Sequence, residues 1–257
     1  MPEKLNYHKR PEWSYSSMKK ILDSGIDYAV AGKLGMLPEP QSQYIDLGQL
    51  AHMIILGGDD TFAISEFPDF RTKAAREWRD EQLAAGKNII TNDQWAAANE
   101  IVKNIENHPH TPKYLIGEGI KHEQEMFAKT AEGIELRGKA DATRLINTAA
   151  IVTDIKTTAK FDEFAKKAFW RHYDLQAAVY SLIAASHLGI DPNMVNFYFC
   201  VAETVAPYRV QYLHASLEFV EAGERKLRTC IDEIVAFGDK QPNFLIEDII
   251  ELGDYSL

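Results

Sequence analysis

The hydrophobic pattern of this chain changes its period near residue 117, and the change limits the folds that the chain can adopt. Before it, apolar side chains recur mostly at helical spacing. After it, residues 118–129 and 134–147 alternate as strands do, joined by a turn-forming segment at 130–133, and a third apolar strand covers residues 149–157. We therefore predict an α/β (α+β) fold with a mostly helical N-terminal part, 1–116, and a sheet-containing part, 117–257.

Helices are predicted where capping residues precede apolar residues at helical spacing. The first follows the hydroxyl residues 14–17 and ends at Gly25 or Gly32. Further helices are predicted over residues 44–56 and 71–87, from Thr91 to before Pro109, and over 161–188 and 216–237. Strands at 193–203 and 208–213 complete the pattern, and the tail from residue 244 to 257 shows no clear preference.

Size and composition favour one compact domain. The 257 residues contain no Pro/Gly/Ser-rich linker, and 46% of them are hydrophobic, which is enough for a substantial core. No apolar run approaches the roughly 20 residues that a membrane span needs, and no basic, apolar leader opens the chain. We expect a cytoplasmic protein that has no contact with a membrane.

The charge and the cysteines exclude some classes of site. Cys200 and Cys230 lie far apart without a CxxC spacing, which argues against a zinc ribbon, an iron–sulfur cluster and a disulfide framework. The net charge of −10 counts against a uniformly basic nucleic-acid binder. It leaves room for a cluster of carboxylates that holds a metal beside a locally basic rim.

The clearest chemical pattern lies on the third predicted strand. Side chains alternate along a strand, so Asp154 and Lys156 project together while Ile155 points into the core. A carboxylate that holds a hard cation, next to an ammonium that positions water, is half of a metal-dependent hydrolase site. The alternative is an exposed ion pair, which contributes only about 0–1 kcal/mol to stability.

Other candidates lie on neighbouring elements. Gly48 and His52 share a face of the predicted helix, and a glycine there indicates that something approaches the backbone closely. A lone histidine on such a helix can equally be structural. Gly138 precedes Asp141 on the second strand, and a hairpin-like continuation places Asp141 beside Asp154, where a divalent cation would offset the repulsion between the two carboxylates.

These short patterns follow one order along the chain: Gly48-x-x-x-His52, Glu123, Gly138-x-x-Asp141, Asp154-x-Lys156 and Gln176-x-x-x-Tyr180. The order resembles the PD-(D/E)XK nuclease superfamily, and specifically its RecE-like (exonuclease VIII) and RecB-like exonucleases. The segment with Tyr7-His8 and Ser14-x-Ser16 is similar to the opening of the RecE catalytic domain. The resemblance implies a restriction-endonuclease-like core in which helices flank a mixed central β-sheet.

The resemblance also implies roles for single residues. His52, Asp141, Asp154 and the backbone carbonyl of Ile155 would be metal ligands, and Lys156 would be the catalytic lysine. Glu123 would help to hold a second metal or orient a water molecule. Gln176 and Tyr180 would contact the DNA strand or brace the site. The sequence departs from the family pattern in having Ala140 where a proline usually stands and Asp154 in place of glutamate.

The implied activity is hydrolysis of linear double-stranded DNA from its ends, 5′ to 3′, with Mg²⁺ or Mn²⁺ and without an iron–sulfur cluster. Such enzymes usually come from prophages, form homo-oligomeric rings and work with a single-strand annealing recombinase. The alternatives are an endonuclease or repair nuclease of other polarity, and a non-catalytic member that binds DNA or a partner. Candidate DNA-contacting surfaces, each of which can also be an ordinary solvated face, are Lys19 and Lys20, Arg76 and Arg79, and Lys166, Lys167 and Arg171.

Overall fold

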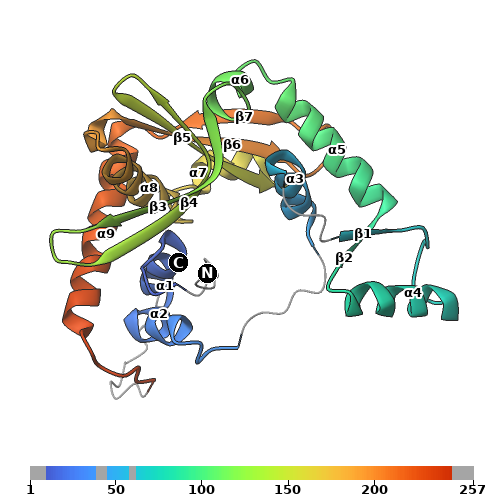
Figure 1. The fold of residues 1–257 in the computed structure, drawn as a ribbon, viewed down its shortest axis with the longest axis horizontal. Helices are drawn as coiled ribbons and strands as arrows, with labels where there is room; N and C mark the ends of the chain where they lie inside the picture. Colours follow the sequence, from blue (N-terminus) through green and yellow to red (C-terminus); the bar gives the residue numbers. More distant parts are fainter. Residues whose placement is uncertain (1–9, 39–44, 58–61, 245–257) are drawn as a thin grey trace, which may run out of the picture.

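A five-stranded mixed sheet forms the centre of the computed structural model, which describes residues 10–38, 45–57 and 62–244. Its strands are β3 (Ile120–Lys129), β4 (Glu135–Ile146), β5 (Ala149–Thr158), β6 (Val195–Glu203) and β7 (Val210–His214), in that spatial order. The β5–β6 pair is parallel and the other three pairs are antiparallel. The predicted α+β fold with a mixed sheet is confirmed (Figure 1).

Helices cover both faces of this sheet because successive strand residues point to opposite sides. On one face, Val152 and Phe197 lie in a core with α1 (Tyr15–Ser24), α8 (Tyr173–Leu188) and α9 (Leu217–Phe237). On the other face, Ile155 and Cys200 pack with α3 (Leu47–Leu56) and α5 (Asn92–Glu106). Two short helices, α2 (Ile26–Lys33) and α6 (Thr111–Tyr114), complete the two layers.

Reciprocal capping boxes fix where three of these helices begin. Ser14 and Ser17 form a reciprocal capping box at α1, Asp46 and Gln49 form one at α3, and Thr91 forms another at α5. The helix α1 ends at Gly25, one of the two predicted stops, where φ is +86°. The predicted helix over residues 44–56 begins at Leu47, and position 44 lies outside the described residues.

Two parts of the chain differ from the prediction. The helix expected over 161–188 is divided into η2 (Phe161–Glu163), α7 (Phe164–Lys167) and α8. His172, which adopts a left-handed conformation with φ of +58°, stops the chain from continuing as one helix into α8. Between α3 and α5, a parallel pair of unpredicted strands, β1 (Phe62–Ser65) and β2 (Asn88–Thr91), flanks α4 (Lys73–Ala84), apart from the main sheet (Figure 1). A short turn of helix, η3 (Pro192–Met194), precedes β6.

Some expectations fall on residues without described structure. They are Tyr7-His8 in the RecE-like opening and the tail beyond residue 244. Among the described residues, no helix combines the length and the apolar character that crossing a membrane requires.

Candidate metal site and its neighbours

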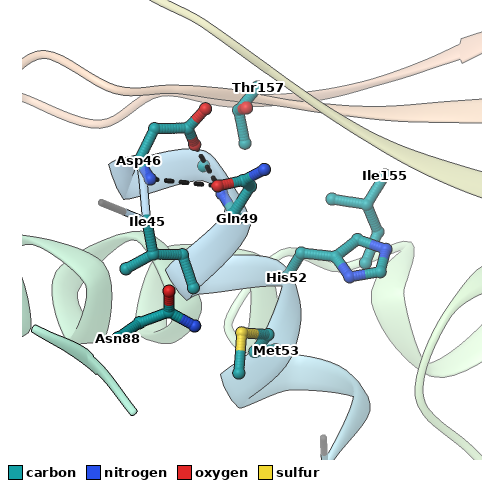
Figure 2. Close-up of a pocket in the computed structure, with 9 residues that line it drawn as sticks. Ile45, Asp46, Gln49, His52, Met53, Asn88, Ile155 and Thr157 are labelled. Carbon is teal, nitrogen blue, oxygen red and sulfur yellow. Dashed lines mark hydrogen bonds between the residues drawn. The ribbon is translucent and has the colours of Figure 1, made fainter. Parts of the chain in front are cut away.

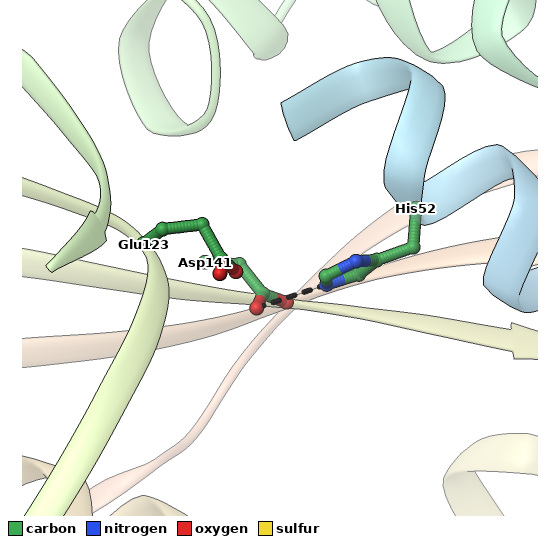
Figure 3. A group of neighbouring side chains, drawn as sticks. All are labelled: His52, Glu123 and Asp141. Carbon is green, nitrogen blue, oxygen red and sulfur yellow. Dashed lines mark ion pairs between the residues drawn. The ribbon is translucent and has the colours of Figure 1, made fainter. Parts of the chain in front are cut away.

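Three potential metal ligands from three different elements meet beside the sheet. His52 on α3, Glu123 on β3 and Asp141 on β4 each offer one ligand atom, and these atoms lie within 4.8 Å of one another. His52 Nε2 is 3.0 Å from Asp141 Oδ1, and Figure 3 shows the three side chains pointing toward one another. Two carboxylates and one imidazole form a donor set that fits Mg²⁺ or Mn²⁺.

A close contact between α3 and β5 places His52 at this point. A Cβ on Gly48 would clash with the Thr157 side chain, so the glycine lets α3 lie directly on the strand. This is the close approach that the sequence predicted. His52 follows one turn later on the same face and, with Thr157 and Ile155, lines a cavity of about 530 Å³ (Figure 2).

The β4–β5 ladder ends where the acidic residues begin. Ala142 pairs with Thr153 at the end of the ladder, and the Ile155 N–H then donates to Asp141 Oδ2 at 2.6 Å. Asp141 therefore satisfies a strand amide with one oxygen and faces His52 with the other. The Ile155 side chain is buried with Ala51, as the alternation of the strand predicted.

Asp154 is engaged differently from the three clustered ligands. Its Oδ2 lies 2.5 Å from Lys156 Nζ, and its Oδ1 accepts a 2.6 Å hydrogen bond from Gln176 Nε2. Gln176 is 3% exposed, so it braces the carboxylate from inside the core. The sequence predicted that His52, Asp141 and Asp154 converge. Among the described residues, the potential ligands that lie within 4.8 Å of one another are instead His52, Asp141 and Glu123.

The charges of these groups depend on one another. Burial raises the pKa of Asp154 to about 6, even though the ammonium of Lys156 acts to lower it. Burial acts to lower the pKa of Lys156, but the attraction of Asp154 outweighs it and the pKa is raised. For His52 too, burial lowers the pKa, and the hydrogen bond and charge of Asp141 raise it above its usual value. Asp154 and Lys156 are therefore an ion pair near neutral pH.

Lys139 is a member of the site that the sequence did not single out. Its ammonium forms an ion pair with Glu123, which has a left-handed φ of +52°. The Tyr180 hydroxyl donates to the Lys139 carbonyl oxygen at 3.2 Å, and its ring lies against Gly138. Lys139 stands two residues before Asp141 on one strand, and this spacing was the available signal.

A mixed sheet thus carries a cluster of acidic and basic side chains from α3, β3, β4 and β5. Residues 14–243 match the model of a family described as "PDDEXK-like domain of unknown function (DUF3799)", and the chain belongs to that family. The resemblance to the superfamily is confirmed.

One solved structure supports the same fold. A candidate exonuclease from Eubacterium rectale matches with a TM-score of 0.57 and 16% identity, over 91% of this chain and 87% of that one. The structure of SSO0001 matches with a TM-score of 0.30 and 12% identity, over 83% of this chain and 84% of that one, which is too low to bear on the fold. A search of curated proteins finds no match.

Proposed function

We propose that this protein is a metal-dependent nuclease that hydrolyses phosphodiester bonds of DNA. The observation that carries the proposal is the convergence of His52, Glu123 and Asp141, next to the buried pair of Asp154 and Lys156, on a PDDEXK-like fold. One imidazole and several carboxylates suit a hard divalent cation. A lysine beside them suits chemistry on a negatively charged substrate.

The residues have separate tasks in this proposal. His52, Glu123 and Asp141 hold the cation, which when bound supplies a more acidic water and neutralises charge on the phosphate. Asp154 and the Ile155 carbonyl complete the ligand set, and Asp154 is close enough to His52 and Asp141 for their charges to affect its pKa. Lys156, held in its charged form by Asp154, orients the attacking water or stabilises the charge that develops on the phosphate.

A basic pocket beside the cluster supports a phosphate-bearing substrate. This cavity of about 400 Å³ lies between α1, α2 and β4, and Lys139 and Tyr180 line it. Lys139 is paired with Glu123, and the Tyr180 hydroxyl donates to the Lys139 carbonyl oxygen, so the cavity adjoins the metal site. Its other cationic side chains are Arg10, Lys20, Lys33 and Arg137. Burial, and to a lesser extent the charge of Arg137, lowers the pKa of Lys33 to about 8. A bound phosphate would supply negative charge to this group of cations.

The finer assignment is an exonuclease. We propose Mg²⁺-dependent digestion of linear duplex DNA, 5′ to 3′, by a homo-oligomeric ring that works with a single-strand annealing recombinase in phage-type recombination. Two observations support it: the resemblance of the motifs to RecE-like enzymes and the name of the similar Eubacterium rectale protein. Mn²⁺ is an expected substitute, since imidazole is a better ligand for manganese than for magnesium.

The test is incubation with matched linear and closed circular duplex DNA, with Mg²⁺, with Mn²⁺ and with a chelator. We expect nucleotides to be released from linear DNA with either cation and none with the chelator, and 5′ and 3′ end labels report the polarity. Lys156→Ala should reduce the rate of hydrolysis by at least about 100-fold. Loss of one hydrogen-bond donor from an oxyanion hole, which also stabilises developing negative charge, has an effect of this order. The matched control is Lys160→Ala, an exposed lysine four residues further on.

Each contrary outcome has a distinct meaning. Cleavage of closed circles at the rate of linear DNA would replace the exonuclease with an endonuclease. Binding of DNA without release in either cation would make the protein a non-catalytic member of its family. Full activity of a folded Lys156→Ala protein would overturn the assignment of the site.

A further inference from the structure

The loop between α7 and α8, residues 168–172, presents two aromatic side chains to solvent. Trp170 is 78% exposed and is the most exposed large apolar side chain among the described residues, and Phe169 is 46% exposed. The two rings meet edge to face, with centroids 6.0 Å apart. An exposed indole leaves a large apolar surface in water, which is characteristic of binding surfaces.

Contacts with other elements hold this loop in place. Lys226 Nζ donates to the Phe169 carbonyl oxygen at 3.1 Å and lies 3.8 Å from the centroid of its ring. The Tyr15 hydroxyl donates to the Arg171 carbonyl oxygen at 3.3 Å. The left-handed His172 then turns the chain into α8. Trp170 therefore projects from a braced loop.

The loop lies next to the proposed catalytic residues. Tyr173 follows Trp170 by three residues, and its ring centroid is 5.1 Å from Lys156 Nζ. Three residues of extended chain span at most about 11 Å. Trp170 is thus within reach of one or two nucleotides of a strand that lies at the cluster.

Positive charge surrounds the exposed aromatic rings. Lys166, Lys167 and Arg171 are exposed, and Lys167 is paired with Glu163. Within the described part of the chain, neither Lys166 nor Arg171 forms an ion pair with an acidic side chain. Two exposed cations that form no ion pair within the described residues, beside an exposed indole, match the phosphates and bases of a nucleic-acid strand.

The other two candidate surfaces lack this combination. Lys19 is paired with Asp23, and Lys20 lines the basic pocket. Arg79 is paired with Asp80 on α4, which lies apart from the main sheet (Figure 1). Of the three surfaces, the one at the loop over 168–172 joins exposed aromatic area, exposed cations that form no ion pair within the described residues, and proximity to Lys156.

We propose that Trp170 stacks on an unpaired base of a single DNA strand at the site, while Lys166 and Arg171 contact its phosphates. This inference rests on the proposed function, since it specifies how that site holds its substrate. Stacking on an indole accepts every base, which suits a nuclease that must act on any sequence.

The test measures binding without hydrolysis. Fluorescence anisotropy follows a labelled, mixed-sequence single-stranded oligonucleotide in the presence of chelator. Trp170→Ala should weaken binding about 5- to 150-fold, and Trp170→Phe should retain most of the affinity because a phenyl ring still stacks. The control is Leu217→Ala, an apolar side chain that is 64% exposed at the start of α9. Lys166→Gln and Arg171→Gln should each lower the slope of log K against log salt by about 0.7.

Unchanged affinity in a folded Trp170→Ala protein overturns the proposal, and so does failure of the unsubstituted protein to bind the strand. A change in molar mass by light scattering, in Trp170→Ala alone, also overturns it, because the indole would then belong to an interface between copies. Since binding is measured apart from hydrolysis, a protein that binds through Trp170 but releases no nucleotides refutes the proposed function and not this inference.

Discussion

Asp154 and Lys156 carry opposite charges where little water reaches them. Their side chains are 10% and 19% exposed, and a 2.5 Å contact joins them. A buried charge without its partner is far costlier than the intact pair is favourable. Replacing only one member of the ion pair should therefore destabilise the fold, whether or not that residue takes part in catalysis.

We predict that Lys156→Met lowers the free energy of unfolding by about 3 kcal/mol, because Asp154 loses its counter-charge. Adding Asp154→Asn should restore at least half of the loss, since the amide is neutral and its oxygen still accepts from Gln176. Urea denaturation at neutral pH measures both values. Lys160→Met, at an exposed position, should stay within about 0.5 kcal/mol. A single Lys156→Met variant as stable as the unsubstituted protein would contradict the prediction.

Alternation along one strand was enough to predict that Asp154 and Lys156 lie together and that Ile155 is buried. It could not predict that Glu123 joins His52 and Asp141. That grouping depends on the left-handed conformation of Glu123 and on a helix whose sequence lies about 70 residues earlier. Only the resemblance to known nucleases gave His52 the role of a metal ligand, and Lys139 was missed.

At the level of elements, the contact between α3 and β5 determines where the histidine stands. Gly48 is buried under Thr157, and a methyl group there must displace either the helix or the strand. We predict that Gly48→Ala destabilises the protein by about 1–2 kcal/mol, the cost of overpacking less the gain in helix propensity. It should also weaken cation binding, because His52 moves with α3.

Gly32→Ala is the matched control. Gly32 lies in α2, and the closest atom to its added Cβ would be Lys20 Nζ at 3.4 Å, the mobile end of a long side chain. We expect this variant to be as stable as the unsubstituted protein or about 0.5–1 kcal/mol more stable. Thermal unfolding with and without Mn²⁺ compares the two glycines, and equal effects would show that the contact with Thr157 is not what constrains Gly48.

Most helices and strands were predictable because their capping residues and the period of their hydrophobic pattern agree with the observed fold. The hairpin of β3 and β4, the helix α5 after Thr91 and the helix α9 after Ser216 are examples. The helix over 161–188 was predicted too long, since nothing in the local sequence shows that His172 adopts a positive φ. Strands β1 and β2 have four residues each, too few to show a period, and they pair across α4.

On the scale of the whole molecule, the helical and sheet-containing parts share one core. Met18 and Ile21 of α1 lie in the same buried cluster as Leu136 of β4, Leu175 of α8 and Ile234 of α9. Neither part can bury its apolar face without the other. This shared core supports the proposal of a single domain over residues 1–257, with one cooperative unfolding transition.

The candidate metal site spans the same division, since His52 comes from the helical part and Glu123 and Asp141 come from the sheet. A cation held by all three would bind the folded chain and not the unfolded one. We therefore predict that Mn²⁺ at about 100 times its dissociation constant adds roughly 2.7 kcal/mol of stability. For a chain of this size that corresponds to a rise in Tm of about 5–10 °C in calorimetry, as a shift of one transition.

Asp141→Asn should abolish the rise, whereas Asp69→Asn, on an exposed loop, should leave it unchanged. An equal rise in both variants would mean that manganese binds elsewhere, and a shift of only one of two transitions would mean that the two parts unfold separately.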